Sequence, residues 1–365
     1  MNFPRRAGLP ALALLMLAAA ALAPGRAAAQ SETEKRAASP NGKIIFQSTQ
    51  GGDGFVNDIY VVEADGKHQT RLTDDPADDV SAQWSPQGNK VAFLSNRRGG
   101  AYELYLMNAD GSNQRPLRDA SPVHAADFKW SPDGTRLAYA KGGDVYVVEV
   151  TSGGDDSTAA PVNVSINKPA GSSDGAPGWS PGGGQLVVRN STACGGCSSD
   201  LHVVNAFDGG GRIELSTGPG FDADPSWSPD GSLIAYEGDR GGRGIYVTPA
   251  AGNGPEVKVS GGHISFGGPA WAPTGSRLVF RALAGNAVYV VNGDGTGLTP
   301  VSDVPSSSGD IFWSPDGSKV AFHNANDLGS MDMFVVASDG SSRRAVNYTK
   351  SRRADEFGHS WQKNQ

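Results

Sequence analysis

Short hydrophobic runs separated by turn residues recur along most of this chain. Val91–Leu94 and Leu104–Met107 are typical, because they contain aromatic or β-branched residues and are bounded by Gly, Pro or Asp, a pattern that predicts short β-strands. An Asp-Gly pair, here Asp110-Gly111, then supplies the positive φ that a two-residue hairpin turn needs. No stretch beyond the N-terminus shows a sustained helical period, so the expected fold class is all-β.

These strands belong to a repeat that is marked by tryptophan. The gaps between consecutive tryptophans are 46, 49, 48, 44, 42 and 48 residues. A period of roughly 40–50 residues is typical of propellers and solenoids. Six of the tryptophans are followed by Ser-Pro-x-Gly or Ala-Pro-Thr-Gly and then by a hydrophobic strand, and four short antiparallel strands per repeat predict the blades of a β-propeller. The seven tryptophans are Trp84, Trp130, Trp179, Trp227, Trp271, Trp313 and Trp361.

The number of blades follows from the two ends of the repeat region. Residues 39–42 read Ser-Pro-Asn-Gly and precede the hydrophobic Lys43–Phe46, but no tryptophan strand comes before them. At the other end, the strand that contains Trp361 is not followed by the remaining strands of a repeat. The sequence therefore predicts seven four-stranded blades, with residues 43–73 and 356–361 sharing one, so that no sheet edge is left open. A six-bladed ring is the second choice.

The repeat resembles the propeller repeats of TolB-family proteins. The resemblance rests on the Trp-Ser-Pro-Asp-Gly segments, on the strands that begin at Asp58 and Asp144, and on the Arg-Leu-Thr of Arg71–Thr73, and it covers nearly all of residues 39–361. It implies the propeller fold rather than a function, because such repeats occur in peptidases, lyases and binding proteins alike. TolB proteins carry an α/β domain ahead of the propeller, and we expect that domain to be absent here.

The N-terminus has the pattern of an export signal. Arg5 and Arg6 precede the apolar Leu9–Ala23, and Ala27–Ala29 offers a small-residue cleavage site, so a bacterial protein of the periplasm or medium is expected. An uncleaved anchor is the alternative, although the apolar run is shorter than the ~20 residues of a membrane span. The expected division is a signal peptide at 1–29, a disordered tail at 30–38 and a single propeller domain at 39–365.

The net charge limits the classes of binding partner, and the two cysteines suggest a disulfide. The net charge is −7 and becomes −10 without the three arginines of the leader, so nucleic acid and anionic membrane surfaces are disfavoured as partners. Neither stable membrane insertion nor oligomerisation is expected. Cys194 and Cys197 are the only cysteines, and in an exported protein they are expected to form a disulfide within a loop. Free thiols, a metal site or redox chemistry remain alternatives.

The fold places the longer loops on one face, which is therefore the candidate for binding. Acidic residues come just before the tryptophans, at the start of the innermost strands, and propeller symmetry would gather them around one channel mouth. They would then hold a Ca²⁺ ion or a partner's Lys or Arg; alternatively, each only caps a turn. The candidate ligand-binding residues are Asp78, Asp79, Asp127, Asp174, Asp222, Asp224, Asp310, Glu356 and His359.

Other chemistry receives weaker support. His124, His263 and His359 precede tryptophans in three different blades, so a metal site would have to span the channel, and His202 occupies a slot that is aromatic in other blades. Gly171–Gly175 matches G-x-S-x-G but lacks the helix that a nucleophile elbow needs. No catalytic residue and no cofactor other than Ca²⁺ are predicted.

Two function classes follow from these observations. The first is an exported non-enzymatic scaffold that presents its loop face and acidic channel mouth to a protein, peptide or envelope ligand. The alternative is a lyase-like carbohydrate-active enzyme with a metal at the channel mouth. The two differ in whether histidines and carboxylates of the rim converge on one point.

Overall fold

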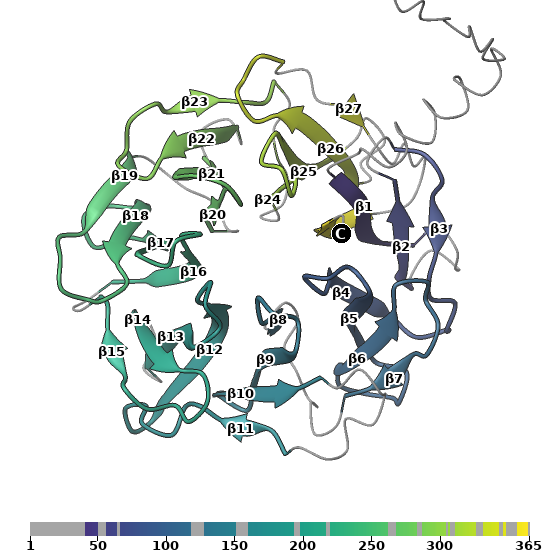
Figure 1. Cartoon of the computed structure of the whole chain (residues 1–365), viewed down its shortest axis with the longest axis horizontal. Coiled ribbons are helices and arrows are strands. Elements are labelled where there is room, and N and C mark those ends of the chain that lie inside the picture. Colours follow the sequence, from purple (N-terminus) through teal and green to yellow (C-terminus); the bar gives the residue numbers. More distant parts are fainter. Residues whose placement is uncertain are drawn as a thin grey trace, which may run out of the picture. The chain divides into compact units, whose positions relative to one another are not determined.

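The protein folds as a ring of β-sheets (Figure 1). The structure is a computed structural model that describes residues 41–49, 56–63, 66–117, 128–150, 160–192, 198–216, 220–261, 268–282, 287–303, 306, 311–325, 331–342, 346–347 and 356–363. Within these ranges every regular element is a β-strand, and the strands form seven four-stranded antiparallel sheets. None of the described segments is a helix long and apolar enough to cross a membrane.

Six blades consist of strands that are consecutive in sequence. Blade 2 contains β4 (Asp79–Trp84), β5 (Lys90–Ser95), β6 (Glu103–Asn108) and β7 (Arg115–Pro116). Blade 3 contains β8 (Phe128–Trp130), β9 (Arg136–Lys141), β10 (Asp144–Glu149) and β11 (Val162–Asn163). Blade 4 contains β12 (Ser172–Trp179), β13 (Gln185–Thr192), β14 (Ser199–Asn205) and β15 (Ile213–Glu214). Blade 5 contains β16 (Asp222–Trp227), β17 (Leu233–Gly238), β18 (Gly244–Pro249) and β19 (Val257–Gly261). Blade 6 contains β20 (Ala270–Trp271), β21 (Arg277–Arg281), β22 (Val288–Asn292) and β23 (Thr299–Pro300). Blade 7 contains β24 (Ile311–Trp313), β25 (Lys319–Ala325), β26 (Met331–Ala337) and β27 (Val346–Asn347).

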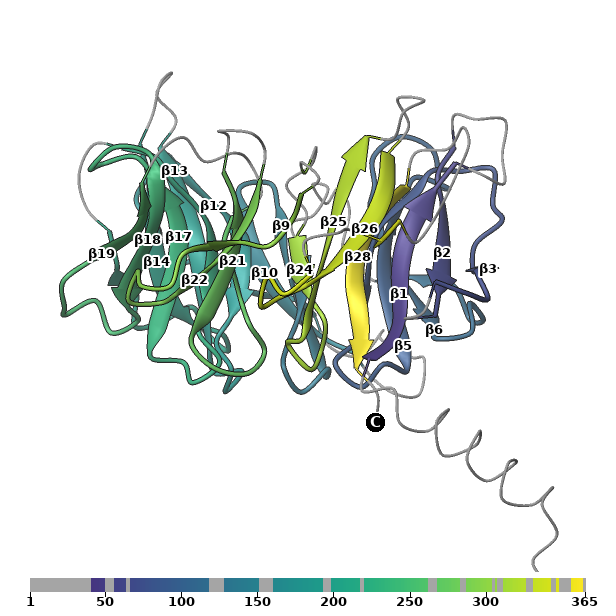
Figure 2. The same cartoon turned by 90° about the horizontal axis from the view of Figure 1, so that it is seen from above.

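Blade 1 closes the ring with strands from both ends of the propeller. It contains β1 (Asn41–Ser48), β2 (Asp58–Val62), β3 (Thr70–Arg71) and β28 (Glu356–Lys363), and β1 pairs on one side with β2 and on the other with β28. Figure 2 shows β28 alongside β1. Ile44 lies opposite Trp361, and Ser48 lies opposite Glu356. The predicted seven-blade closure is confirmed, and the six-bladed alternative is wrong.

Pairs of aromatic rings lie in the middle of most blades. In six blades an aromatic residue of the second strand lies opposite one of the third, with ring centroids from 5.6 Å apart in the Phe93–Tyr105 pair to 6.1 Å in the Phe322–Phe334 pair. Blade 4 differs, because Val188 lies opposite His202 at this place. His202 therefore occupies the aromatic packing position that the sequence predicted.

The tryptophans join each blade to the one before it. The indole Nε1 of Trp271 donates a hydrogen bond to the carbonyl of Ser226, the residue that precedes the tryptophan of blade 5. The same bond recurs from Trp130, Trp179, Trp227 and Trp313 to the preceding blade, at 2.9–3.3 Å. It is missing at the closure, where the buried Nε1 of Trp84 has no hydrogen-bond partner among the described residues and Trp361 bonds to Gly42 of its own blade.

The Ser-Pro-Asp-Gly turns explain why the repeat keeps this sequence. In blade 3 the carboxylate of Asp133 accepts hydrogen bonds from the hydroxyl of Ser131 and from the backbone of Thr135. Gly134 then takes a φ of 63°, a left-handed conformation that glycine adopts without a Cβ penalty. Hydrogen bonds of its own side chains thus hold the turn that connects the tryptophan strand to the next strand. These tight turns lie on one face, which leaves the opposite face for the longer loops.

Candidate binding site on the loop face

We call the loop face the end of the blades where the inner strands β4, β8, β12 and β16 begin. Three of the predicted carboxylates lie here in equivalent places, because Asp79, Asp174 and Asp222 each stand five residues before a tryptophan. All three are buried, with 0%, 3% and 0% of their surface exposed. Asp79 lies opposite Ser95, the last residue of β5, which places it at the loop end of its blade.

Each of these carboxylates is ion-paired within the chain. Arg97 contacts Asp79 at 2.8 Å, and Arg212 contacts both oxygens of Asp174, at 2.8 and 2.9 Å. Arg240 contacts Asp222 and also reaches Asp200 at 2.7 Å.

The charges of these three carboxylates are therefore compensated by arginines of the same chain. The arginines were missed by the sequence reasoning. Yet Arg97 and Arg240 both lie 18 residues after their partners, a recurring spacing that could have revealed them.

Burial and pairing shift the pKa values of this site in different directions. Burial raises the pKa of Asp222 to about 6, against the opposing charge of Arg240. At Asp174 burial also acts upward, but the hydrogen bonds from Arg212 and Asn190 outweigh it, and the net pKa is lowered. Burial, together with the positive charge of Arg212, lowers the pKa of His202 to about 4, so this imidazole is neutral at pH 7.

The remaining predicted rim residues differ in their surroundings. Asp78 accepts hydrogen bonds from the backbone and side-chain nitrogens of Asn57, at 2.8 and 2.9 Å, and from the hydroxyl of Tyr102, so it connects blades 1 and 2. Burial and the Asp78 carboxylate raise the pKa of Tyr102 to about 12. Asp224 is exposed.

Several predicted residues lie outside the described residues, namely Asp127, Asp310, His124, His263, Cys194 and Cys197. For Glu356 and His359 of β28, only the backbone is described. The predicted acidic rim and the predicted disulfide therefore stay predictions. In the described ranges no group of three or more His, Cys, Asp or Glu side chains is placed to hold a metal ion.

A backbone irregularity recurs beside the three ion pairs. Ser81, Ala176 and Asp224 have φ values of 57°, 48° and 50°, and each lies two residues after the buried aspartate of its strand. The strand register shifts at the same places, as expected for β-bulges, which re-aim side chains and often lie next to functional sites. Positive φ is uncommon outside glycine, so its repetition in three blades indicates a common local geometry of the inner strands.

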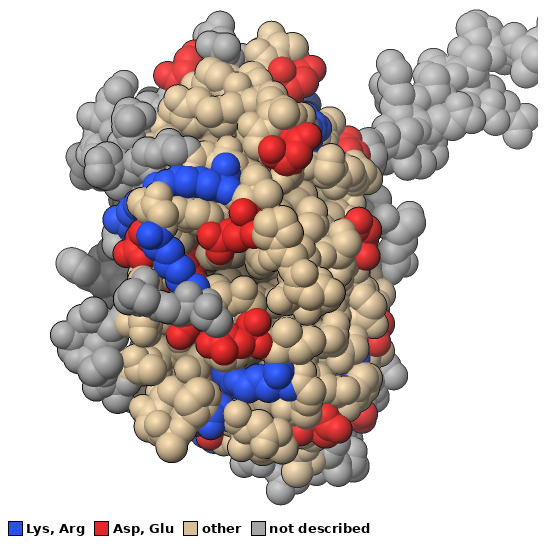
Figure 3. All heavy atoms as spheres, turned by 90° about the vertical axis from the view of Figure 1, so that its left-hand side faces the viewer, with Lys and Arg blue, Asp and Glu red and all other residues tan. Residues whose placement is uncertain are grey.

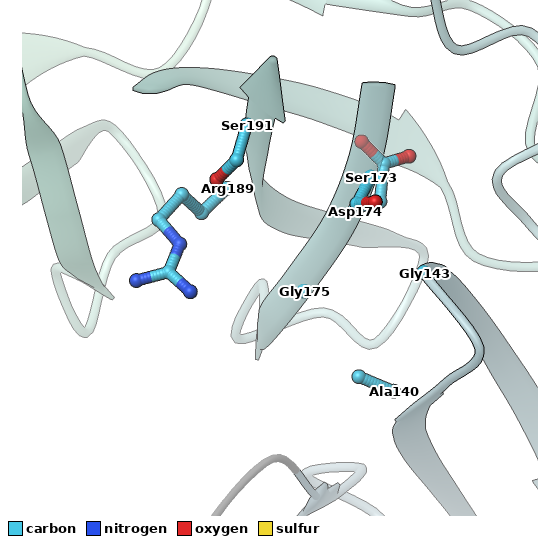
Figure 4. A pocket seen from close by; sticks show the side chains of 7 residues that line it. All are labelled: Ala140, Gly143, Ser173, Asp174, Gly175, Arg189 and Ser191. Atoms are coloured by element: carbon cyan, nitrogen blue, oxygen red, sulfur yellow. The ribbon is translucent and has the colours of Figure 1, made fainter. Parts of the chain in front are cut away.

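Blade 4 has a hollow on the loop face (Figure 4). Its volume is about 230 Å³, and it is bordered by Gly143, by Ser173 of β12, and by Arg189 and Ser191 of β13. Gly143 belongs to the turn between β9 and β10, in which Gly142 and Gly143 have φ values of 62° and 82° that allow a two-residue connection. The Gly-x-Ser-x-Gly match runs into β12 here and does not form a strand–turn–helix elbow.

Charges of both signs are intermixed on the outside of the ring. On the flank that Figure 3 shows, Lys and Arg side chains lie beside Asp and Glu, and most of the surface consists of other residues. Ion pairs such as Arg243–Glu237, at 2.9 Å, are consistent with this distribution. The described residues of this flank therefore form no continuous surface of one sign.

Sequence comparisons point to one kind of propeller. Residues 100–265 match the family described as the TolB beta propeller domain. The Tol-Pal system protein TolB of Bordetella pertussis is 33% identical over 161 residues, which cover 44% of this chain and 34% of that protein. The corresponding protein of Bordetella parapertussis is 34% identical over the same length. The matched segment thus covers only about a third, 34%, of the length of each of these two relatives.

Solved structures share the fold at lower identity. An oligogalacturonate lyase in complex with manganese is 15% identical, with a TM-score of 0.62, over 83% of this chain and 84% of that one. TolB from Acinetobacter baumannii is 17% identical, with a TM-score of 0.52, over 90% of this chain and 84% of that one. At such identities the likeness shows the fold alone. The seven-bladed ring and the sequence match over residues 100–265 together establish that this chain carries a TolB-like β-propeller.

Proposed function

We propose that this propeller is an exported, non-enzymatic scaffold that binds a protein or peptide partner of the cell envelope through its loop face. The similarity of residues 100–265 to the TolB propeller domain carries the proposal, because the relatives in question are Tol-Pal system proteins. The export signal expected in residues 1–29 supports a location in the periplasm or medium.

The loop face has the rigidity that such a role needs. Ion pairs of Arg97 and Arg240 fix the loops after β5 and β17 to the inner strands of blades 2 and 5. A surface fixed before binding loses less conformational entropy when a partner docks, which favours affinity. Exposed Asp224 follows the ion-paired Asp222 by two residues, and its carboxylate is our candidate for contact with a Lys or Arg of the partner.

Affinity capture from a solubilised envelope fraction tests the proposal. Immobilised wild-type protein should retain a partner, and retention should weaken as ionic strength rises. Asp224→Asn removes the charge while keeping a residue type that tolerates positive φ, and it should reduce the retained amount.

Glu149→Gln is the matched control. Glu149 is also exposed but ends β10 on the opposite face, so its substitution should leave retention unchanged. Equal retention by the wild type and Asp224→Asn would exclude the Asp224 contact. Absence of any retained partner would contradict the binding function itself.

A further inference from the structure

The boundary between blades 5 and 6 departs from the repeat at the first residue of a second strand. In blades 2–7 this residue stands six positions after the tryptophan of its blade. It is long and polar in five of the six blades, and the residues are Lys90, Arg136, Gln185, Arg277 and Lys319. In blade 5 the same place is taken by Leu233, which is apolar and shorter.

The two arginines show what this position does elsewhere. The guanidinium of Arg136 lies over the indole of Trp179 in the next blade, 4.8 Å from the ring centroid, and donates to the carbonyl of Gly183 at 2.7 Å. Arg277 lies in the same way over Trp313, at 5.4 Å, and donates to the carbonyl of Ser338 at 3.3 Å. A cation over an indole face is attracted by the ring, so each arginine holds its blade to the next one.

A pocket lies where Leu233 replaces this arginine. Blades 5 and 6 are neighbours in the ring (Figure 1), and the pocket opens between them at the turn face, the end of the blades that carries the Ser-Pro-x-Gly turns. Its volume is about 570 Å³. One wall is apolar and comes from blade 5, whereas the other comes from the β22–β23 turn of blade 6; the wall residues include Leu233, Val247, Pro249, Val257, Gly293 and Asp294.

The blade 6 wall has the groups that bind an arginine in blade 7. Gly293 corresponds to Ser338, because the N–H of each bonds to the carbonyl of the residue five positions after the tryptophan of its blade. The carbonyl of Ser338 accepts from Arg277. At Gly293 the preceding blade has Leu233, which carries no donor, in place of the arginine.

Asp294 also corresponds to a carboxylate beside an arginine. Asp339 occupies its place in blade 7, where hydrogen bonds from Ser341 and the positive charge of Arg277 lower its pKa. Asp294 is exposed and accepts hydrogen bonds from Thr296, but it forms no ion pair with any residue in the part of the chain that the structure describes. The pocket therefore has a negative charge at its border without the cation found at the next boundary.

Lys258 does not supply that cation, although it belongs to the outer strand of blade 5. Its ammonium donates to the carbonyls of Gly241 and Gly242, at 3.0 and 2.6 Å, and lies over the ring of Tyr246. Tyr246 packs into the core cluster shared with blade 4. Val247, in contrast, packs into the cluster shared with blade 6. The charge of Lys258 is thus directed to the other side of the sheet.

We propose that this pocket binds an arginine side chain of a partner protein. The aliphatic stem of the arginine would pack on the apolar wall formed by Leu233 and Val247. Its guanidinium would lie beside Asp294, with N–H donors for the carbonyl of Gly293. The volume falls within the roughly 300–1,000 Å³ of small-molecule sites, so adjoining atoms of the partner also fit. The site lies on the face opposite to the loop face and is independent of the function proposed there.

Saturation-transfer difference NMR, which detects weakly bound small ligands, tests the assignment. The probes are acetyl-Gly-Arg-Gly-amide, its citrulline counterpart, which has a similar shape but no charge, and its lysine counterpart. The blocked termini leave the central side chain as the only charge. Wild-type protein should bind the arginine peptide most tightly, the lysine peptide more weakly because a single ammonium lacks the fork of donors, and the citrulline peptide weakest of the three.

Three variants connect the binding to this pocket. Leu233→Arg supplies the protein's own guanidinium, as in blades 3 and 6, and should abolish binding of the arginine peptide. Asp294→Asn removes the border charge and should weaken binding about two- to fivefold, as expected for an exposed ion pair. Asp339→Asn is the matched control, because Asp339 is an exposed aspartate in the same turn of blade 7. It should leave the affinity unchanged.

The melting temperature separates lost binding from unfolding. Leu233→Arg should melt at or above the wild-type temperature, because the repeat accepts an arginine at this place in two other blades. Undiminished binding by Leu233→Arg, or equal losses in Asp294→Asn and Asp339→Asn, would overturn the inference. Equal affinities for the arginine and citrulline peptides would exclude the charge, and equal affinities for arginine and lysine would exclude the selection of a guanidinium. Retention of the envelope partner by the loop face is unaffected by any of these results.

Discussion

The inter-blade tryptophans allow one hydrogen bond to be separated from the packing of a large ring. We predict that Trp271→Phe destabilises the protein more than Trp84→Phe. The two residues are equally buried, with 7% and 6% of their surface exposed, and they occupy equivalent places in their strands. The loss of volume is the same in both variants. The difference lies in the indole N–H. That of Trp271 donates to the carbonyl of Ser226 across the blade boundary at 3.0 Å, whereas that of Trp84 has no partner in the part of the chain that the structure describes.

The magnitude follows from what each substitution removes. Trp271→Phe breaks a buried bond and leaves its acceptor without this donor, which costs about 1–3 kcal/mol beyond the cost of the smaller ring. Trp84→Phe breaks no such bond and removes a buried unpaired donor, which recovers a penalty of about 1–3 kcal/mol. The free energies of unfolding should therefore differ by at least about 2 kcal/mol between the variants.

Equilibrium unfolding in urea, followed by tryptophan fluorescence and by circular dichroism, measures this difference. Coincident transitions by the two probes and unchanged slopes are needed for the comparison of free energies. Equal destabilisation by the two substitutions, or a larger effect at Trp84, would refute the assignment of the inter-blade bond as a stabilising contact.

Three further changes test the closure and the buried titrating groups. Deleting residues 356–365 removes β28 and the burial of Trp361, so the truncated protein should lose its cooperative thermal transition, and melting at the wild-type temperature would contradict the closure by blade 1. The Asp222 carboxyl has a folded-state pKa raised to about 6, so wild-type stability should fall relative to Asp222→Asn by up to about 3 kcal/mol as pH rises from about 4 to 6. The pKa of His202 is lowered to about 4, so its effect has the opposite sign, and the wild type should lose stability relative to His202→Phe as pH falls from about 6.5 to 4. Urea unfolding at each pH measures both differences, and a difference that does not change with pH would rule out the corresponding shift.

The fold could be predicted from the sequence because its determinants are local. The Ser-Pro-Asp-Gly turn satisfies its own polar groups within a few residues, as the bonds of Asp133 show. Asp110-Gly111 makes its hairpin turn with a φ of 85° at the glycine. The strands and turns of each repeat can therefore be predicted from residues within that repeat, and the spacing of the tryptophans predicts the length of the repeat. The prediction that N- and C-terminal strands share blade 1 followed from the incomplete repeats at the two ends of the repeat region.

The candidate site was less predictable because its contacts join residues that are distant in sequence. The sequence placed the acidic residues in one ring, but Asp79 stands five residues before its tryptophan and Asp127 only three. In blades 2, 4 and 5 the position three residues before the tryptophan lies in a β-bulge, and the positive-φ residues there, Ser81, Ala176 and Asp224, share no residue type. Arg212 lies 38 residues after Asp174, so nothing local indicates that pair.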